Sequence, residues 1–344
     1  MLQALYNNSK LKLAVVMPAV VITVNCEPTT VNGYLNSYGR TMVKDRIRIG
    51  TRSSRLALWQ ANWVKEQLEK RYPSIKCSLE KIKTRGDKIT DVPLAKVGGK
   101  GLFLKEIEDA LLNGKIDIAV HSMKDVPTTL PEGLIIRAIT EREDFRDALI
   151  SRDNIKLGDL PLNSRIGTSS LRRQAQLLHF CKSFHVVALR GNLDTRLKKL
   201  NTHPLDAIIV AAAGLKRMGW EDRISEYIPP EIMLPAIGQG ALGIETRVDD
   251  DRSNEIVDFL NSPDSETTII AERTFLRRLE GGCQVPIAAL SEINNRVLTL
   301  CGIVGSIDGR VILRDSVEGN PDNPAVLGEK LAEKLLDKGA GEVF

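Results

Sequence analysis

The chain has 344 residues and a formal net charge of +4, with 42% hydrophobic and 27% charged residues. This length predicts two or three domains, and so small a charge excess gives no indication of nucleic-acid binding. The five cysteines and four histidines are scattered, without the spacing of a disulfide framework or a metal site. Scattered thiols favour a reducing compartment, and we therefore expect a cytoplasmic protein.

The first 45 residues carry few charges and no sustained periodicity. Their apolar run, residues 13–24, is interrupted by Pro18 and is shorter than the ~20 residues that a membrane-spanning helix needs, so no membrane association is expected. Regular patterning begins at Arg46. We therefore interpret residues 1–45 as an N-terminal extension that is disordered or, if Met42 is the true start, not native. A plastid location is the alternative if residues 1–41 are a transit peptide, although this segment is poor in arginine.

Strands and helices alternate from Arg46 onward. Strands are expected at 46–50, 77–83 and 116–120, with helices at 56–71 and up to Leu112. Ser53 and Ser54 are suitable N-caps for the first helix. This β-α-β-α-β order predicts a mostly parallel sheet with helices on both faces.

A second series of the same kind follows. Strands are expected at 165–167, 185–189 and 206–210, and helices begin after residues 168–170, at 193 and at 212. In such sheets ligands bind beyond the carboxyl ends of the strands. Those ends carry residues 51–54, 121–125, 167–170 and 190–192. Two such units facing each other would form a cleft lined by helix N-termini, which favour anions.

The pattern changes near residue 263. A helix at 266–279, strands at 297–303 and 310–314, and a helix at 325–336 predict a small α+β domain. Cys283 follows paired glycines and precedes Pro286, so it is expected on a tight loop just after the first of these helices. Most cysteines are small buried apolar residues, but this position makes Cys283 a candidate for a reactive thiol.

Several basic residues are expected at the mouth of the cleft. They are Arg52, Lys100, Lys124, Arg172, Arg173, Arg190, Arg196 and Arg217. Arginine is suited to a two-point grip on carboxylates or phosphates. The pair Arg172–Arg173 opposes the dipole of its helix, so it predicts either a bound anion or a solvated helix face.

Asp125 is the one acid among these cations. It should stay ionised and attract a developing positive charge, unless it only forms the turn before Pro127. The segment Gly98–Gly101 lacks the spacing of a phosphate-binding loop. It predicts either a flap over the cleft or an ordinary turn with a solvated Lys100.

Taken in order, these motifs resemble the porphobilinogen deaminase, or hydroxymethylbilane synthase, family. The resemblance runs from about Arg46 to the C-terminus, and its ordered set is far more specific than any single motif. The matching segments are residues 49–57, 98–103, 121–127, 167–173, 190–196 and 234–240, with the Cys283 loop.

The resemblance implies a transferase that joins four porphobilinogen molecules head to tail into hydroxymethylbilane and releases ammonia at each addition. It implies a monomer in haem, chlorophyll or corrin biosynthesis, with the product passed to uroporphyrinogen-III synthase. It also implies one dipyrromethane cofactor per chain, attached by a thioether to Cys283. No metal is implied.

The resemblance assigns the catalytic role to Asp125. The remaining residues that it assigns to cofactor binding are Ser122, Lys124, Thr168, Ser170, Arg172, Arg173, Arg190 and Gly191. Those that it assigns to substrate binding are Arg52, Ser54, Lys100, Phe103, Arg196, Arg217 and Gln239. For Phe103 a core contact of the following helix is an equal alternative.

The fold implied is α/β, with two domains like type II periplasmic binding proteins and a small α+β C-terminal domain. A segment returning after Gly238–Gly240 should complete the first domain. The expected domains are 46–140 with 241–258, 146–234, and 263–344. Two alternatives remain. A solute-binding or effector-sensing module would need neither Cys283 nor Asp125. An acyl-transfer cysteine would need a histidine base, and none is evident near the loop.

Overall fold

The computed structural model describes residues 46–84, 104–279 and 285–343, and the strands between residues 2 and 25. The chain divides into two compact units, Met1–Asp45 and Arg46–Phe344. The described part of the first unit is an antiparallel sheet with strands in chain order. They are β1 (Leu2–Asn7), β2 (Lys10–Met17) and β3 (Val20–Asn25).

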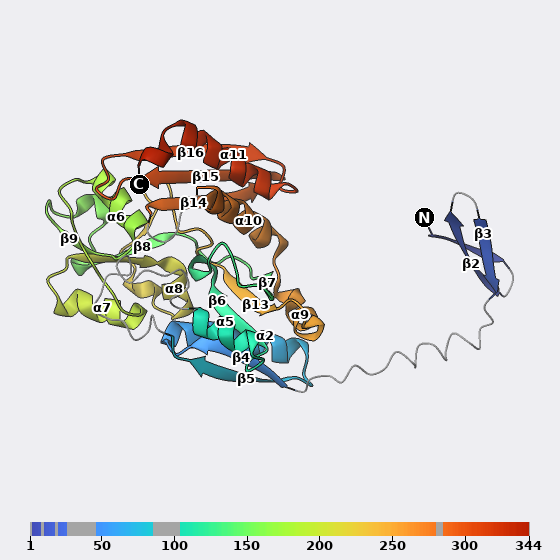
Figure 1. The fold of residues 1–344 in the computed structure, drawn as a ribbon. Helices are drawn as coiled ribbons and strands as arrows, with labels where there is room; N and C mark the ends of the chain where they lie inside the picture. Colours follow the sequence, from blue (N-terminus) through green and yellow to red (C-terminus); the bar gives the residue numbers. More distant parts are fainter. Residues whose placement is uncertain are drawn as a thin grey trace. The chain divides into compact units, whose positions relative to one another are not determined.

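The described residues of the second unit form two five-stranded sheets and one three-stranded sheet, in agreement with the predicted α/β fold class. In the first sheet, β4 is parallel to β5 and β6, whereas β13 is antiparallel to both β6 and β7. The strand order is β5 (Lys76–Ile82), β4 (Arg46–Arg52), β6 (Ile118–Ser122), β13 (Leu242–Arg247) and β7 (Leu134–Ile139). The segment after Gly240 therefore returns to this sheet as β13 (Figure 1).

Helices cover both faces of this sheet. Val120 packs in one core with α2 (Arg55–Arg71) and α9 (Asp251–Val257), while its neighbour Ala119 packs in another with α5 (Lys105–Leu112). Successive residues of a strand point to opposite faces, so these helices lie on opposite sides. The predicted N-cap of α2 is confirmed at Ser54, whose hydroxyl accepts a hydrogen bond from the Ala57 amide at 3.3 Å.

The second sheet repeats this arrangement. Its strand order is β10 (His185–Val187), β9 (Arg165–Gly167), β11 (Ala207–Ala211), β8 (Asp147–Ser151) and β12 (Glu226–Ile228). The first three are parallel, and β8 is antiparallel to β11 and β12. Three helices surround it, with α6 in one core and α7 and α8 in the other. They are α6 (Leu171–Phe180), α7 (Leu193–Thr202) and α8 (Ala212–Arg217).

Two crossover segments, residues 140–146 and 229–241, connect the sheets. Each antiparallel strand follows a crossover directly: β8 follows the first, and β13 follows the second. The mostly parallel sheets were predicted correctly, but both of these reversed strands differ from the simple β-α-β pattern. A strand that enters from the other lobe has no preceding crossover helix in its own sheet, so nothing forces it to run parallel to its neighbours.

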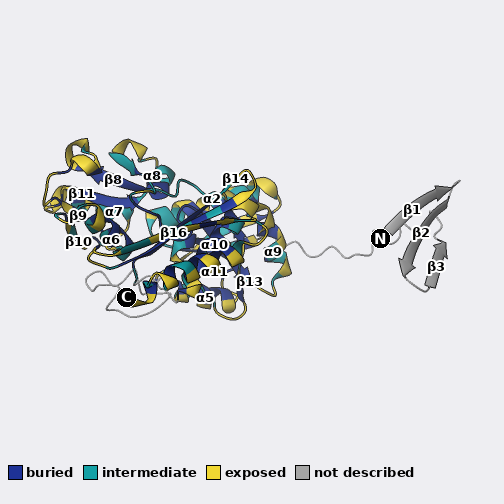
Figure 2. Ribbon diagram, turned by 90° about the horizontal axis from the view of Figure 1, so that it is seen from above, coloured by how far each residue is buried: buried dark blue, intermediate teal, exposed yellow. Residues whose placement is uncertain are grey.

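The third sheet is antiparallel and packs against two helices. Phe275 of α10 is fully buried beneath it, and a Cβ at Gly302 would lie 2.8 Å from that ring. The strands are β14 (Ile287–Asn294), β15 (Val297–Gly305) and β16 (Ile312–Gly319), and the helices are α10 (Pro263–Arg278) and α11 (Pro324–Asp337). The buried residues lie between sheets and helices in each layer (Figure 2). Over the part of the chain that is described, no helix is long and apolar enough to span a membrane.

Candidate functional site

Asp125 stands at the edge of a pocket at the carboxyl end of β6. It belongs to a short 3₁₀ turn, Met123–Asp125, and its side chain is exposed. The pocket has a volume of about 90 Å³, and its polar lining includes Arg52, Ser54 and Ser122. Four residues predicted for the site therefore converge at this end of the first sheet.

The turn that carries Asp125 is anchored by its neighbour Met123, which is only 2% exposed. A Cβ at Gly243 would lie 2.4 Å from the Met123 sulfur, so a larger residue there would displace this anchor. The Met123 amide donates a hydrogen bond to the Ala241 carbonyl at 3.0 Å. The core thus fixes one side of the turn while the Asp125 carboxylate faces solvent.

Gln60 is a pocket residue that sequence reasoning missed. Its amide nitrogen donates to the Ser122 hydroxyl at 3.0 Å, and it is buried on α2. A polar residue on the buried face of an amphipathic helix was the available signal, because such a residue needs a partner. Gln60 on α2 therefore fixes the position of the Ser122 hydroxyl.

The second lobe contributes a buried cluster around Asp147, the first residue of β8. The guanidinium groups of Arg172 and Arg173 both donate hydrogen bonds to this fully buried carboxylate. The distances are 2.6 and 3.1 Å for Arg172 and 2.7 Å for Arg173. The arginines hold the pKa of Asp147 far below its usual range despite its burial.

This geometry excludes one of the two alternatives expected for Arg172 and Arg173. They do not form a solvated helix face, since each is about 5% exposed. Asp147 supplies one compensating anion inside the protein. One carboxylate between two arginines still leaves a formal excess of one positive charge. The Arg173 Nε atom is also buried and, among the described residues, without a hydrogen-bond partner.

Gln239 connects this cluster to the first lobe. Its amide oxygen accepts hydrogen bonds from Arg172 at 3.2 Å and from the Lys124 ammonium at 3.3 Å, and its nitrogen donates to Asp147 at 2.9 Å. The side chain is fully buried, so it acts as a bridge between charged groups. It holds Lys124, the neighbour of Asp125, beside the arginine pair.

Lys124 lies in a buried and cationic environment. Burial and the nearby Arg173 lower the pKa of its ammonium to about 8, although Asp125 and Asp147 act in the opposite direction. A cation surrounded by other cations is stabilised when an anion binds, because the anion offsets their repulsion. Lys124 is therefore placed to respond to a carboxylate-bearing ligand.

Arg196 and Arg190 extend the cationic region. Burial lowers the pKa of Arg196 to about 10, and the charges of Arg173, Asp125 and Arg190 also act on it. Its Nε donates to the Gly191 carbonyl at 2.9 Å. Gly191 has φ of +109°, and a Cβ there would lie 2.6 Å from the Thr195 side chain, so glycine is required at this turn. Arg196 is thereby brought toward Asp125 from the second lobe.

The remaining predicted polar residues have more local partners. The hydroxyl of Thr168 accepts a hydrogen bond from the Ser170 amide at 3.2 Å, and the Ser170 side chain does not cap α6. Arg217 donates to the Gly240 carbonyl at 2.5 Å, and burial lowers its pKa to about 10. Arg217 thus contacts the second crossover directly. Cys283, Lys100 and Phe103 lie outside the described residues.

A buried His–Glu pair lies behind the pocket. The Nε2 atom of His121, a pocket-lining residue, is 2.9 Å from the Glu245 carboxylate. Glu108 of α5 is close by, and burial, together with the Glu245 charge, raises its pKa. Within the described part of the chain no group of His, Cys, Asp and Glu side chains is arranged to hold a metal ion.

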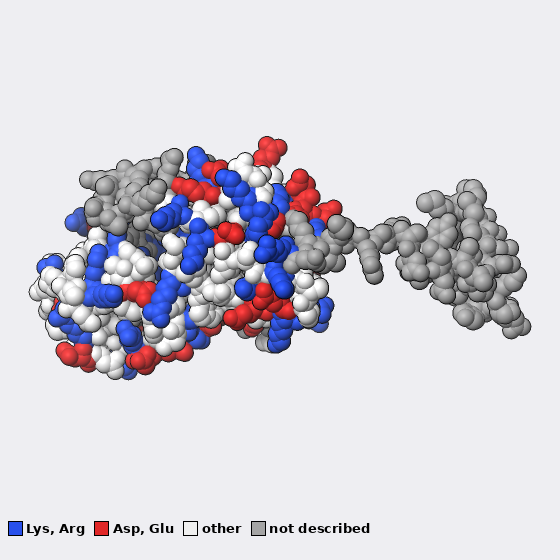
Figure 3. Space-filling view, turned by 90° about the horizontal axis from the view of Figure 1, so that it is seen from below, with Lys and Arg blue, Asp and Glu red and all other residues white. Residues whose placement is uncertain are grey.

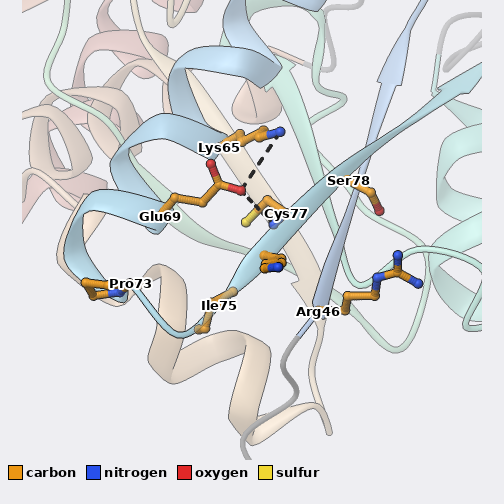
Figure 4. A pocket seen from close by; sticks show the side chains of 8 residues that line it. Arg46, Lys65, Glu69, Pro73, Ile75, Cys77 and Ser78 are labelled. Atoms are coloured by element: carbon orange, nitrogen blue, oxygen red, sulfur yellow. Dashed lines mark hydrogen bonds and ion pairs between the residues drawn. The ribbon is translucent and has the colours of Figure 1, made fainter.

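A larger, open pocket lies elsewhere, beside β5 and the end of α2 (Figure 4). There the Glu69 carboxylate accepts a hydrogen bond from the Cys77 amide at 2.9 Å and lies 3.9 Å from the Lys65 ammonium. Burial raises the pKa of the Cys77 thiol to about 11, so this sulfur is protonated and unreactive at neutral pH. This second pocket is larger than the one beside Asp125, but none of the residues around Asp125 line it. It is therefore not the candidate site.

The described surface carries charges of both signs. On the face drawn in Figure 3, Lys and Arg side chains are interspersed with Asp and Glu side chains. The case for an anionic ligand therefore depends on the cations close to Asp125 and not on the charge of this face as a whole.

Comparison with known proteins gives consistent matches across the second unit. One family model, described as porphobilinogen deaminase, dipyromethane cofactor binding domain, matches residues 47–255, and another, described as its C-terminal domain, matches 266–337. The porphobilinogen deaminase of Geobacter metallireducens is 58% identical over 303 residues, covering 88% of this chain and 95% of the relative. That of Pelobacter propionicus is 57% identical over 299 residues, covering 87% and 96%. A crystal structure of the methionine binding protein MetQ is similar at a TM-score of 0.40 and 13% identity, covering 63% of this chain and 90% of that one.

Proposed function

The chain belongs to the porphobilinogen deaminase family, the hydroxymethylbilane synthases, and on this premise we propose that it joins four porphobilinogen molecules head to tail into hydroxymethylbilane. One ammonia leaves at each addition. We propose that it acts as a cytoplasmic monomer and passes its product to uroporphyrinogen-III synthase. The family match separates this enzyme from the solute-binding and acyl-transfer alternatives.

One observation carries the proposal: cations from both lobes surround a single exposed carboxylate. Lys124 and Arg52 come from the first lobe and Arg196 from the second, and the charge of Arg173 acts on both Lys124 and Arg196. Porphobilinogen and its oligomers carry acetate and propionate groups on every pyrrole ring. A polyanion of this kind needs several cations, and Asp125 remains to interact with the reacting pyrrole.

The residues present fit a dipyrromethane cofactor. The buried Arg173 Nε lacks a hydrogen-bond partner among the described residues, and the cluster around Asp147 retains an excess positive charge. Both are features that a cofactor carboxylate would satisfy. We assign Arg172, Arg173, Arg190, Lys124 and the hydroxyl groups of Ser122, Thr168 and Ser170 to holding it. When bound through Cys283, the dipyrromethane supplies the primer for chain growth.

Asp125 has the central chemical role in this proposal. As ammonia leaves the aminomethyl group of the substrate, positive charge develops on the substrate pyrrole. The Asp125 carboxylate can accept a hydrogen bond from the pyrrole N–H and offset this charge. In this proposal it also relays the proton lost from the pyrrole carbon. Arg52, Ser54, Arg196, Arg217 and Gln239 would orient the substrate, with Lys100 and Phe103 of the segment outside the described residues.

The experiment is an assay of purified wild-type protein and Asp125→Asn with porphobilinogen. Wild type should release ammonia and form hydroxymethylbilane, and its mass should include a two-pyrrole adduct that maps to Cys283. Asp125→Asn should keep the adduct but lose turnover by ~10²-fold or more, as when an electrostatic partner of a transition state is removed. An inactive wild type carrying the adduct, or near-normal turnover of the variant, would contradict the assignment. An adduct on Cys77, Cys181 or Cys301 would contradict the role of Cys283.

A further inference from the structure

Arg273 of α10 reaches across to the segment that follows Asp125. Its Nη1 atom donates to the Val126 carbonyl at 2.9 Å, and its Nη2 atom donates to the Pro127 carbonyl at 2.5 Å. These are the two residues immediately after Asp125. An arginine from the third domain thus holds the main chain next to the proposed catalytic carboxylate.

Among the described residues, the charge of Arg273 is not neutralised by a carboxylate. The described residues provide it with no ion-pair partner, and burial together with Arg277 lowers its pKa. A half-buried guanidinium without a carboxylate is costly, because part of its hydration is lost. Its two planar donors instead match two successive carbonyls, which is a geometry that fixes the direction of the backbone.

The Asp125 turn needs such support. The described residues give the Asp125 carboxylate no side-chain hydrogen bond, so its position depends on the main chain on either side. Before it, the Met123 amide is held by the Ala241 carbonyl, and the Val126 amide closes the turn onto the Met123 carbonyl at 3.2 Å. After it, the Arg273 contacts are the ones that link the segment to another domain.

The position of Arg273 on α10 adds a connection to the cofactor loop. Its neighbour Glu272 is fully buried and accepts hydrogen bonds from Arg142 at 2.6 Å and from the Gly238 amide at 2.8 Å. The same helix ends at Arg278, five residues before Cys283. One turn of α10 therefore holds both crossovers and the Asp125 segment.

We infer that Arg273 is a positioning residue for Asp125, which keeps the catalytic carboxylate in register with the cysteine-bearing domain. This inference rests on the proposed function. Arg273 would touch neither substrate nor cofactor, and would act only by fixing the backbone at residues 126 and 127.

The test compares Arg273→Ala and Arg273→Lys with Arg277→Ala, an exposed position on the same helix. Arg273→Ala should lower kcat by ~10-fold or more, as expected for a displaced catalytic group, with KM and adduct mass unchanged. Arg273→Lys should recover only part of the loss, because an ammonium cannot bond both carbonyls in one plane. Arg277→Ala should match wild type.

The deciding measurement is the double variant Asp125→Asn with Arg273→Ala. If Arg273 acts through Asp125, kcat should fall no more than about 2-fold below that of Asp125→Asn alone. Hydrogen exchange of the amides in residues 123–128 should be faster in Arg273→Ala and normal in Arg277→Ala. If Arg273→Ala fails to fold, Arg273→Lys is carried through the same cycle and exchange measurement.

The inference would be overturned if the two substitutions together lowered kcat by the product of their separate effects. Normal kcat and normal amide exchange in the Arg273 variants would also overturn it. Wild type without deaminase activity would instead refute the proposed function. An active wild type with an impaired Asp125→Asn and a normal Arg273→Ala would leave the function standing and remove only the role of Arg273.

Discussion

At the scale of single residues, Asp147 is the group that organises the second lobe. It brings two arginines of one helix turn into the interior and connects them through Gln239 to Lys124. The arginines therefore have a structural partner, and in the proposed function they also hold a cofactor carboxylate. Their buried pairing fixes where their remaining donors point, which pre-organises the site for a carboxylate.

The Asp147 carboxylate should be essential for stability. Asp147→Asn removes the charge and leaves two buried guanidinium groups uncompensated, so we expect a loss of ~3–5 kcal/mol in the free energy of unfolding. Urea denaturation of the purified variant gives this value. Asp125→Asn is the matched control, since that carboxylate is exposed, and it should unfold like wild type. Equal stability of the two variants would show that the arginine pair does not need Asp147.

At the scale of elements, α5 packs one acidic side chain, Glu108, against the first sheet. Glu108 faces β6 and β13, where His121 and Glu245 already form a pair. One oxygen each of Glu108 and Glu245 is buried without a hydrogen-bond partner in the described part of the chain. Burial, which disfavours the charged form, is the main reason why the pKa of Glu108 is raised, and the nearby charge of Glu245 adds to it.

This arrangement predicts a specific pH dependence. Because the folded state holds the Glu108 proton at pH values where the unfolded state has lost it, this group lowers stability as pH rises from about 4.3, the unfolded value, through the raised folded value. Glu108→Gln keeps the size of the side chain and removes the titration. Its unfolding free energy should exceed that of wild type at pH 7–8, and the difference should vanish below pH 4.

Denaturant titrations across this pH range measure the effect, with Glu66→Gln on the exposed face of α2 as the control. A constant difference between Glu108→Gln and wild type at all pH values would mean that Glu108 does not titrate in this window.

At the scale of the whole molecule, the two crossovers and the third domain meet at α10. A Cβ at Gly240 would lie 2.2 Å from the Glu143 carbonyl, so the crossovers pack against each other with no room for a side chain. Arg142 and Glu272 then join the first crossover to α10 through a buried ion pair. The crossovers that connect the two lobes are thus joined to the third domain at α10.

Removal of residues 1–41 should leave cofactor attachment, turnover and thermal stability unchanged. The compact unit that contains the site begins at Arg46, and the family match begins at residue 47. Truncation is tolerated where the removed backbone supplies no core contacts to the remaining domain. Intact mass, ammonia release and melting temperature of the truncated protein check this. A truncated protein that fails to fold, or that keeps its adduct but loses activity, would show that the extension is part of the enzyme.

Much of the architecture was determined by local sequence. The N-cap at Ser54, the helices α2, α6 and α10, and the parallel strands follow from periodicity and capping, because these signals act over a few residues. The placement of Asp125 at the end of β6 also followed from sequence, since the carboxyl ends of parallel strands share one edge of the sheet. The reversed strands β8 and β13 did not, because their direction depends on chain crossings between lobes.

The charge balance of the site was decided only by the tertiary structure. Nothing near Arg172 in the sequence identifies Asp147, which lies 25 residues earlier in a buried strand, as its partner. The same holds for two other pairs. Gln60 and Ser122 are 62 residues apart in the sequence, and Arg273 and Val126 are 147 residues apart. Sequence indicated that cations and one acid gather in a cleft. Folding decided which charges neutralise one another, because pairing depends on distance in space and on burial.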